Sequence, residues 1–174
     1  MVSNNIPFFS LIILNQLLEE GNSLYRRNLF RESSIKYKAA IKRLPREVDQ
    51  EWQQPFYHLK TNLLLNLSRC ERRQGNLNEA VHLASIVIGS NPKCVDALIA
   101  RAKAYKAIGR LSEAVKDYSS ALCRVPTNRG IYLAFLKLRE EMKMKNQTNR
   151  NAFGLGSCDS IACIDDTSTN CSSV

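Results

Sequence analysis

Amide and cationic side chains recur at helical spacing in this sequence, and they are its strongest candidates for chemistry. One run consists of Asn62, Asn66, Arg69 and Arg73. Its members are three or four residues apart, so on a helix they would share one face. Asparagine amides can hydrogen-bond a peptide backbone, and guanidinium groups pair with carboxylates. The run therefore predicts a surface that binds a peptide.

Two shorter sets extend this surface. Asn22 and Arg26 precede the run, and Lys103 and Lys106 follow it. Positive charge would converge if these helices lie side by side, so we expect an acidic or phosphorylated peptide, such as a receptor tail, as the ligand. The alternative on charge alone is a solvated basic surface without a ligand.

Catalytic and metal-binding patterns are absent from the sequence. His58 and His82 are isolated from any Asp, Ser or Cys that would make them part of a catalytic set. Gly154-Leu155-Gly156 lacks the strand, helix and lysine of a phosphate-binding loop. No two cysteines form a C-x-x-C pair; they are Cys70, Cys94, Cys123, Cys158, Cys163 and Cys171. We therefore expect no enzyme activity, no cofactor and no metal.

A period of 34 residues organises the helices that would position these side chains. The pairs at this spacing are Gly75 and Gly109, Ala80 and Ala114, and Pro92 and Pro126. Pro45 lies 47 residues before Pro92, so 13 extra residues separate the first two copies. A two-helix unit of this length, with small residues where the helices cross and a proline at its exit, resembles the tetratricopeptide repeat (TPR).

Individual residue types have recognisable packing roles in such a repeat. Gly21, Ser68 and Ala102 share one position on the first helix of each pair, where a small side chain allows close approach. Tyr37 and Tyr118 are large residues that would fill the space between neighbouring pairs. Each proline lacks an N–H and disfavours helix at the residue before it, so it should end the second helix.

The predicted fold is an all-α, TPR-type helical solenoid of three helix pairs plus a C-terminal capping helix, followed by a disordered tail. Residues 1–13 have no defined role, and the insertion either extends a helix or forms a loop. The predicted parts are a TPR domain over 14–146, repeats at about 14–47, 61–94 and 95–128, an insertion at about 46–58, a capping helix over 129–145, and a tail over 147–174.

Charge is unevenly distributed along the chain. The first 146 residues hold 24 Lys and Arg against 13 Asp and Glu, whereas the last 28 hold one against three. A basic nucleic-acid-binding protein is therefore an alternative, but basic residues are not interleaved with aromatic ones, and we expect no nucleic acid as partner. No apolar run reaches the length of a membrane span, so we expect no direct membrane insertion.

One group of TPR proteins offers a second alternative, a cochaperone. These proteins clamp the carboxylate tails of heat-shock chaperones with two Asn, two Lys and one Arg, and Asn22 and Asn66 match the two asparagines. The three cation positions hold Leu18, Asp96 and Ala100. Without those cations a terminal double carboxylate would be poorly compensated, so we predict no binding of chaperone tails.

Two runs resemble a narrower family. The stretches 62–70 and 91–104 are similar to the C-terminal repeats of the TANC family, which includes rolling pebbles, and the resemblance covers residues 17–146. It implies a cytoplasmic scaffold recruited to the cell cortex or the postsynaptic density, or in insects to sites of myoblast adhesion. The family's ankyrin and P-loop segments have no counterpart here, so a fragment, a short isoform or a gene-model artefact are the alternatives.

The chain end fits the same resemblance. Ser172, Ser173 and Val174 place a hydroxyl two residues before an apolar terminal side chain. PDZ domains bind such an end as an added edge strand, with a pocket for the last side chain. The resemblance implies a PDZ-domain scaffold as a second protein partner, and an unstructured tail without a reader is the alternative.

Overall fold

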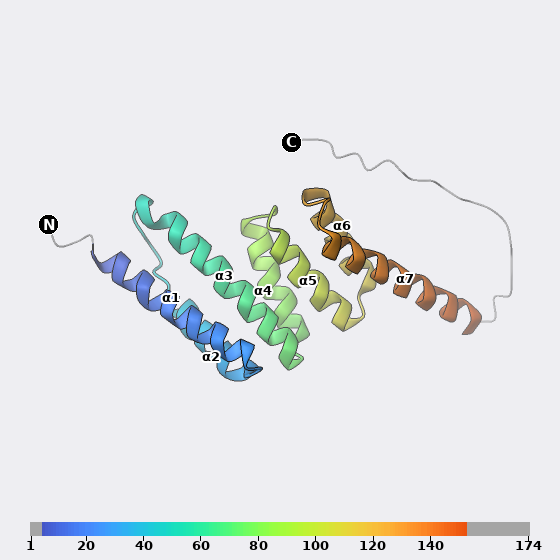
Figure 1. Ribbon diagram of the computed structural model, residues 1–174, viewed down its shortest axis with the longest axis horizontal. Helices are drawn as coiled ribbons and strands as arrows, with labels where there is room; N and C mark the ends of the chain where they lie inside the picture. The colour runs from blue at the N-terminus through green and yellow to red at the C-terminus, as the bar shows by residue number, and fades with distance from the viewer. Residues whose placement is uncertain (1–4, 153–174) are drawn as a thin grey trace.

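The structure is a computed structural model that describes residues 5–152, with side chains for residues 7–148. Every element in this range is an α-helix, and the helices follow one another along the long axis of the molecule (Figure 1). They are α1 (Asn5–Arg26), α2 (Phe30–Lys42), α3 (Gln50–Gln74), α4 (Leu77–Ser90), α5 (Val95–Ile108), α6 (Leu111–Arg124) and α7 (Arg129–Ala152). The predicted all-α TPR solenoid is confirmed.

The helices form two layers. Each helix from α1 to α7 packs on its neighbour in sequence, and in addition α1 contacts α3 and α3 contacts α5. The first helices of the three pairs therefore line one common surface, while α2, α4 and α6 form the other layer. This arrangement places the predicted cationic and amide side chains of α1, α3 and α5 next to one another.

A left-handed residue turns the chain within each helix pair. Gly75 and Gly109 have φ of 89° and 92°, and their positions are 34 residues apart. Asn28 takes the same place in the first pair with φ of 61°, and it is the single described non-glycine residue with positive φ. Asparagine tolerates this conformation better than most residues, so the first repeat turns without a glycine.

Small residues and hydroxyls hold the two helices of a pair together. A Cβ on Gly21 would collide with the buried ring of Tyr37, so glycine is required where α1 crosses α2. Ser33 Oγ donates to the Gly21 carbonyl and Ser68 Oγ to the Ala80 carbonyl, each at 2.8 Å. Both hydrogen bonds are buried and join the two helices of a pair, a role beyond the small size that the sequence predicted for Ser68.

The prolines mark the exits of the second helices as predicted. The helices α2, α4 and α6 end at Lys42, Ser90 and Arg124, shortly before Pro45, Pro92 and Pro126. Pro55 behaves differently, because it lies inside α3. It falls near the start of a long helix, where its missing N–H removes a single backbone bond.

The structure assigns helix to two segments that the sequence left open: residues 5–13, which had no defined role, and part of the insertion, where a longer helix was one of two alternatives. Residues 5–13 belong to α1, and α3 begins at Gln50, inside the predicted insertion. These two extensions pack on each other: the rings of Phe8 and Trp52 have centroids 6.3 Å apart, and Phe56 is buried. Neither segment has a repeat pattern of its own, so only their mutual contact shows why both are helical.

The capping helix is longer than predicted. Residues 146–152 continue α7 beyond the predicted end at residue 145, and all of them except residue 146 fall in the predicted disordered tail. These residues lack glycine and proline, and Thr148 Oγ1 donates to the Met144 carbonyl at 2.9 Å, so nothing local ends the helix. The rest of the predicted tail lies outside the described residues, as do the PDZ-type end (Ser172, Ser173, Val174) and the last three cysteines.

Candidate peptide-binding groove

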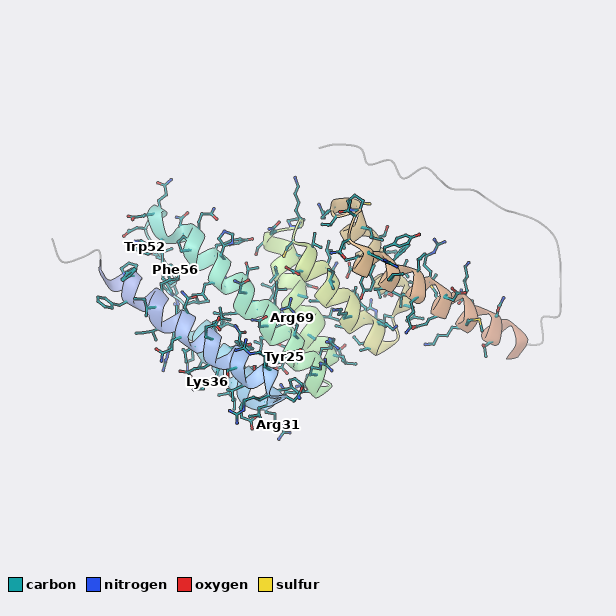
Figure 2. All side chains as sticks on the ribbon, viewed as in Figure 1. Tyr25, Arg31, Lys36, Trp52, Phe56 and Arg69 are labelled. Carbon is teal, nitrogen blue, oxygen red and sulfur yellow. The ribbon has the colours of Figure 1, made fainter. Side chains whose placement is uncertain are left out.

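Two adjoining hollows lie on the surface formed by α1, α3 and α5. The first, which we call the amide pocket, has a volume of about 170 Å³ and lies between α1 and α3. Its lining residues are Asn22, Tyr25, Arg26, Tyr37, Asn66 and Arg69. Figure 2 shows Tyr25 and Arg69 close together where the two helices meet.

Hydrogen bonds inside the amide pocket occupy most of its polar groups. Asn22 Oδ1 accepts from the Tyr37 hydroxyl at 2.7 Å and from Asn66 Nδ2 at 2.9 Å. Asn66 Oδ1 accepts from Arg69 Nη1 at 2.9 Å, and Asn22 Nδ2 donates to Glu19 at 3.2 Å. Each asparagine amide thus retains one N–H for a ligand, while both side-chain carbonyls are engaged.

The second hollow, which we call the cationic cleft, lies between α3 and α5. Its volume is about 330 Å³. It is lined by Tyr25, Ser68, Arg69, Arg72, Arg73, Asp96, Ile99, Ala100 and Lys103. We refer to Arg69, Arg72, Arg73 and Lys103 as the cleft cations. They stand beside apolar surface from Tyr25, Ile99 and Ala100, and Asp96 is the one acidic residue of the lining.

The positive charge of the cleft is largely uncompensated. No ion pair among the described residues involves any of the cleft cations. Loss of hydration lowers the pKa of Lys103, and repulsion from the three cleft arginines lowers it further, against a smaller opposing effect of Asp96. A group whose charged form is disfavoured in this way gains from an arriving anion, because the anion supplies the missing counter-charge.

Neighbouring contacts hold both walls of the cleft in place. On one wall, the guanidinium of Arg73 lies over the Phe30 ring, 5.8 Å from its centroid, and Phe30 packs edge-on against Tyr25 at 5.2 Å. On the other wall, Arg101 makes two hydrogen bonds of 2.8 Å to Asp117, which fix α5 against α6. Bidentate pairs of this kind restrain orientation as well as distance, so the cleft is preformed.

The structure corrects the predicted groove at two residues. Lys106 was expected to converge with Arg69 and Arg73, but its ammonium donates to Glu141 on α7 at 2.6 Å. It lies one turn nearer the C-terminal end of α5 than Lys103, where Glu141 of the capping helix is within reach. Asn62 is exposed on α3 and lines neither hollow, because the hollows form nearer the C-terminal half of that helix.

The structure groups the other predicted residues in the two hollows and adds further lining residues, among them Arg72 and Tyr37. Asn22, Arg26 and Asn66 meet in the amide pocket, Arg73 and Lys103 in the cationic cleft, and Arg69 lines both. Arg72 was missing from the predicted groove, although its place three residues after Arg69 was a usable signal. Tyr37, expected to act only in packing, also orients Asn22 through its hydroxyl.

Three positions separate this groove from a carboxylate clamp. Leu18 and Ala100 are 8% and 6% exposed and belong to the apolar core. Asp96 lies on the rim of the cationic cleft. The cleft cations occupy other positions of α3 and α5, so the positive charge is present but displaced from the clamp positions.

Neither a metal-binding cluster nor a membrane-spanning helix occurs among the described residues. Over the described range, no three or more His, Cys, Asp and Glu side chains come together to hold a metal ion. Within that range, too, no helix combines the length and apolar character of a membrane span.

Comparison with known sequences gives distant relatives. No protein-family model matches the chain. It is similar to Protein unc-45 homolog B of Xenopus tropicalis, with 30% identity over 114 residues, and to HSP-interacting protein of Zea mays, with 28% over 123 residues. Protein PHOX1 of Arabidopsis thaliana is 26% identical over 115 residues. These matches cover 65–68% of this chain but only 11–15% of each relative.

Comparison with solved structures identifies the fold. The C-terminal TPR-containing domain of a Plasmodium falciparum protein superposes with a TM-score of 0.71 at 22% identity, covering 84% of this chain and 99% of that one. The Hsp90 co-chaperone Cns1 of Saccharomyces cerevisiae gives 0.68 at 22%, covering 83% and 44%. The first TPR of Spaghetti (RPAP3), bound to the HSP90 peptide SRMEEVD, gives 0.63 at 21%, covering 75% and 95%. The chain is an all-α TPR solenoid.

Proposed function

We propose that this chain is a non-enzymatic protein-interaction module whose cationic cleft binds an acidic stretch of a partner protein. The observation that carries the proposal is the convergence of the cleft cations on one preformed hollow without ion-pair partners among the described residues. Asp or Glu carboxylates, or a phosphorylated side chain, would complete these charges. The apolar surface of Ile99 and Ala100 would receive the neighbouring side chains of the peptide.

The amide pocket would continue the binding surface toward α1. The remaining N–H groups of Asn22 and Asn66 can donate to the carbonyls of an extended peptide. Since Asn22 Oδ1 already accepts two hydrogen bonds and Asn66 Oδ1 accepts one, this pocket offers mainly donors to a ligand. A peptide crossing both hollows would thus be held by its backbone at α1 and α3 and by its acidic side chains at α3 and α5.

A cochaperone that binds chaperone tails is the second candidate, and two observations favour it. One neighbour in the solved structures carries an HSP90 peptide, SRMEEVD, and one relative is an HSP-interacting protein. The residues at the clamp positions favour an internal acidic stretch over a chain end as the ligand, because Leu18, Asp96 and Ala100 cannot hold a terminal carboxylate. A PDZ domain as reader of Ser172 to Val174, and a cortical or postsynaptic location, are further proposals that rest on the TANC resemblance.

The decisive experiment measures the affinity of a fluorescein-labelled Glu-rich peptide by anisotropy. The double variant Arg69→Glu/Arg73→Glu should weaken binding about 100-fold, because two attractive contacts become repulsive. Arg31→Glu/Arg43→Glu changes the net charge equally at exposed positions of the other layer and should have little effect. Equal losses in the two variants, or equal binding of a Gln-substituted peptide, would contradict the proposal.

The same assay separates the two candidate functions. The labelled peptide is compared with a free C-terminal carboxylate and with an amidated C-terminus. An internal acidic stretch predicts affinities within about twofold, whereas a carboxylate clamp predicts a loss of about tenfold or more on amidation. A labelled single-stranded RNA serves as a third probe, and tighter binding of RNA than of the Glu-rich peptide would favour the nucleic-acid alternative.

A further inference from the structure

We propose that the acidic segment near the C-terminus of this same chain, containing Asp159, Asp165 and Asp166, occupies the cationic cleft when no partner is bound. This inference rests on the proposed function, because it assigns a regulator to the same cleft. Three features carry it: the charge of the two parts, the place where α7 directs the chain, and the composition of the segment.

The cationic cleft and the acidic segment carry opposite charges. The cleft cations have no ion-pair partner among the described residues, and the surrounding body of the chain is strongly basic. Residues 147–174 hold the three aspartates against the single cation Arg150, so this stretch is acidic whereas the body before it is basic. Opposite charges joined by one covalent chain attract at any protein concentration.

The path of α7 brings the segment within reach. Lys106 bonds to Glu141 at 2.6 Å, which holds the middle of α7 beside the C-terminal end of α5, one helical turn from Lys103. From Glu141, α7 rises about 17 Å to its last residue, Ala152. An extended chain from Ala152 to Asp165 spans up to about 45 Å, more than enough to return to the cleft.

The composition of the segment matches the lining of the cleft. Asp165 and Asp166 directly follow Ile164, so carboxylates and an apolar side chain would arrive together. The cleft offers the same pairing, with cations beside Ile99 and Ala100.

A larger hollow of about 650 Å³ beside α7 is the competing location, lined among others by Lys106, Leu111, Glu140, Glu141 and Met144. Its lining also includes Lys137 and Lys145, but it is a weaker candidate because it is less positive than the cationic cleft: Glu141 pairs with Lys106, and Glu140 offsets a second lysine.

The consequence is competition between the segment and a partner peptide. A tethered segment has an effective concentration on the order of 1 mM, so even a weak intramolecular contact lowers the apparent affinity for a partner severalfold. Neutralising the aspartates would remove this competition. Phosphorylated or more acidic partners would displace the segment, and weakly acidic ones would not.

The test compares three versions of the 174-residue chain in the anisotropy assay with the labelled Glu-rich peptide at low ionic strength. Asp159→Asn/Asp165→Asn/Asp166→Asn should bind the peptide about fivefold more tightly than the unmodified chain. Glu47→Gln/Asp49→Asn/Glu51→Gln changes net charge equally at exposed positions far along the chain and should bind within about twofold of the unmodified chain. Equal affinities of the two triple variants would overturn the inference while leaving the proposed function intact, and no binding by any protein would reject the proposed function.

A second measurement needs no peptide. NMR signals of the Lys103 side chain should differ between the unmodified chain and the Asp159→Asn/Asp165→Asn/Asp166→Asn variant, and the difference should shrink at high salt. Identical Lys103 signals would overturn the inference. Changes at the Met144 methyl without changes at Lys103 would place the segment in the hollow beside α7 and would overturn it as well.

Discussion

The amide pocket and the cationic cleft are neighbours on one surface, share Arg69 and Tyr25, and yet differ in how their polar groups are satisfied. In the amide pocket, Tyr37, Asn22, Asn66 and Arg69 bond to one another, so the pocket is nearly complete without a ligand. In the cationic cleft, Arg72 and Lys103 have neither a hydrogen bond nor an ion pair within the described part of the chain.

This contrast determines which hollow can contribute binding energy to a ligand. Groups that already bond within the protein must exchange one partner for another, so a ligand gains little from them. Unpaired cations that repel one another gain directly from an anion. We therefore expect the amide pocket to contribute mainly to stability and the cationic cleft mainly to affinity.

Disrupting the packing of Gly21 against Tyr37, which supports the amide pocket, should have the largest effect on the free energy of unfolding. Gly21→Ala would press a methyl group into the Tyr37 ring and displace the hydroxyl that holds Asn22, at a cost of about 2–3 kcal/mol in unfolding free energy. Gly89→Ala is the matched control, because it lies near the end of α4 with open space around its Cβ and should stabilise the helix by up to about 1 kcal/mol. Urea unfolding measures both, and equal effects would show that the contact with Tyr37 does not matter.

Replacing one arginine in each hollow by glutamine compares how much the two hollows contribute to the affinity for the Glu-rich peptide. Arg72→Gln in the cationic cleft should weaken the Glu-rich peptide about tenfold, or about 1.4 kcal/mol, whereas Arg26→Gln in the amide pocket should weaken it by about twofold or less. Both variants lose one positive charge, so a general charge effect cancels. If Arg26→Gln costs as much as Arg72→Gln, the two hollows act as one site.

Removal of one hydroxyl isolates the hydrogen bond that closes the amide pocket. Tyr37→Phe should lower the unfolding free energy by about 1 kcal/mol, because Asn22 Oδ1 loses a donor. Tyr118→Phe alters the equivalent tyrosine of the third repeat, whose hydroxyl makes no hydrogen bond within residues 7–148, and should change stability by about 0.3 kcal/mol or less. Equal free energies of unfolding in Tyr37→Phe and Tyr118→Phe would show that the Tyr37 hydroxyl does not contribute to stability.

Titration of Lys103 gives the smallest and most local effect. Its pKa is lowered by lost hydration and by the cleft arginines, so Arg72→Gln should raise it toward the ordinary lysine value. Because the folded state disfavours the protonated form, Lys103 costs stability at neutral pH, and this cost fades as the pH rises toward that ordinary value. NMR of the lysine side chain measures the pKa directly. An unchanged pKa in Arg72→Gln would mean that the two side chains do not share the cleft.

Local spacing determined much of this protein by itself. The period of 34 residues, the prolines after α2, α4 and α6, and the glycines at the turns predict the three helix pairs and their order. Each of these signals acts within a few residues through backbone conformation, so it can be read without knowing the neighbours in space. The same holds for the shared face of Asn66, Arg69 and Arg73 on α3, because helical spacing alone places them together.

Tertiary contacts decided the rest. Residues 5–13 and 50–54 extend α1 and α3 and pack on each other through Phe8 and Trp52. No local sequence pattern predicts this contact. Lys106 turned from the groove to Glu141, although its type and spacing matched the other cations. Which polar groups remain free for a ligand follows from how Tyr37, Asn22 and Asn66 meet across three helices. Such pairings join residues far apart in sequence, so only the packed solenoid determines them.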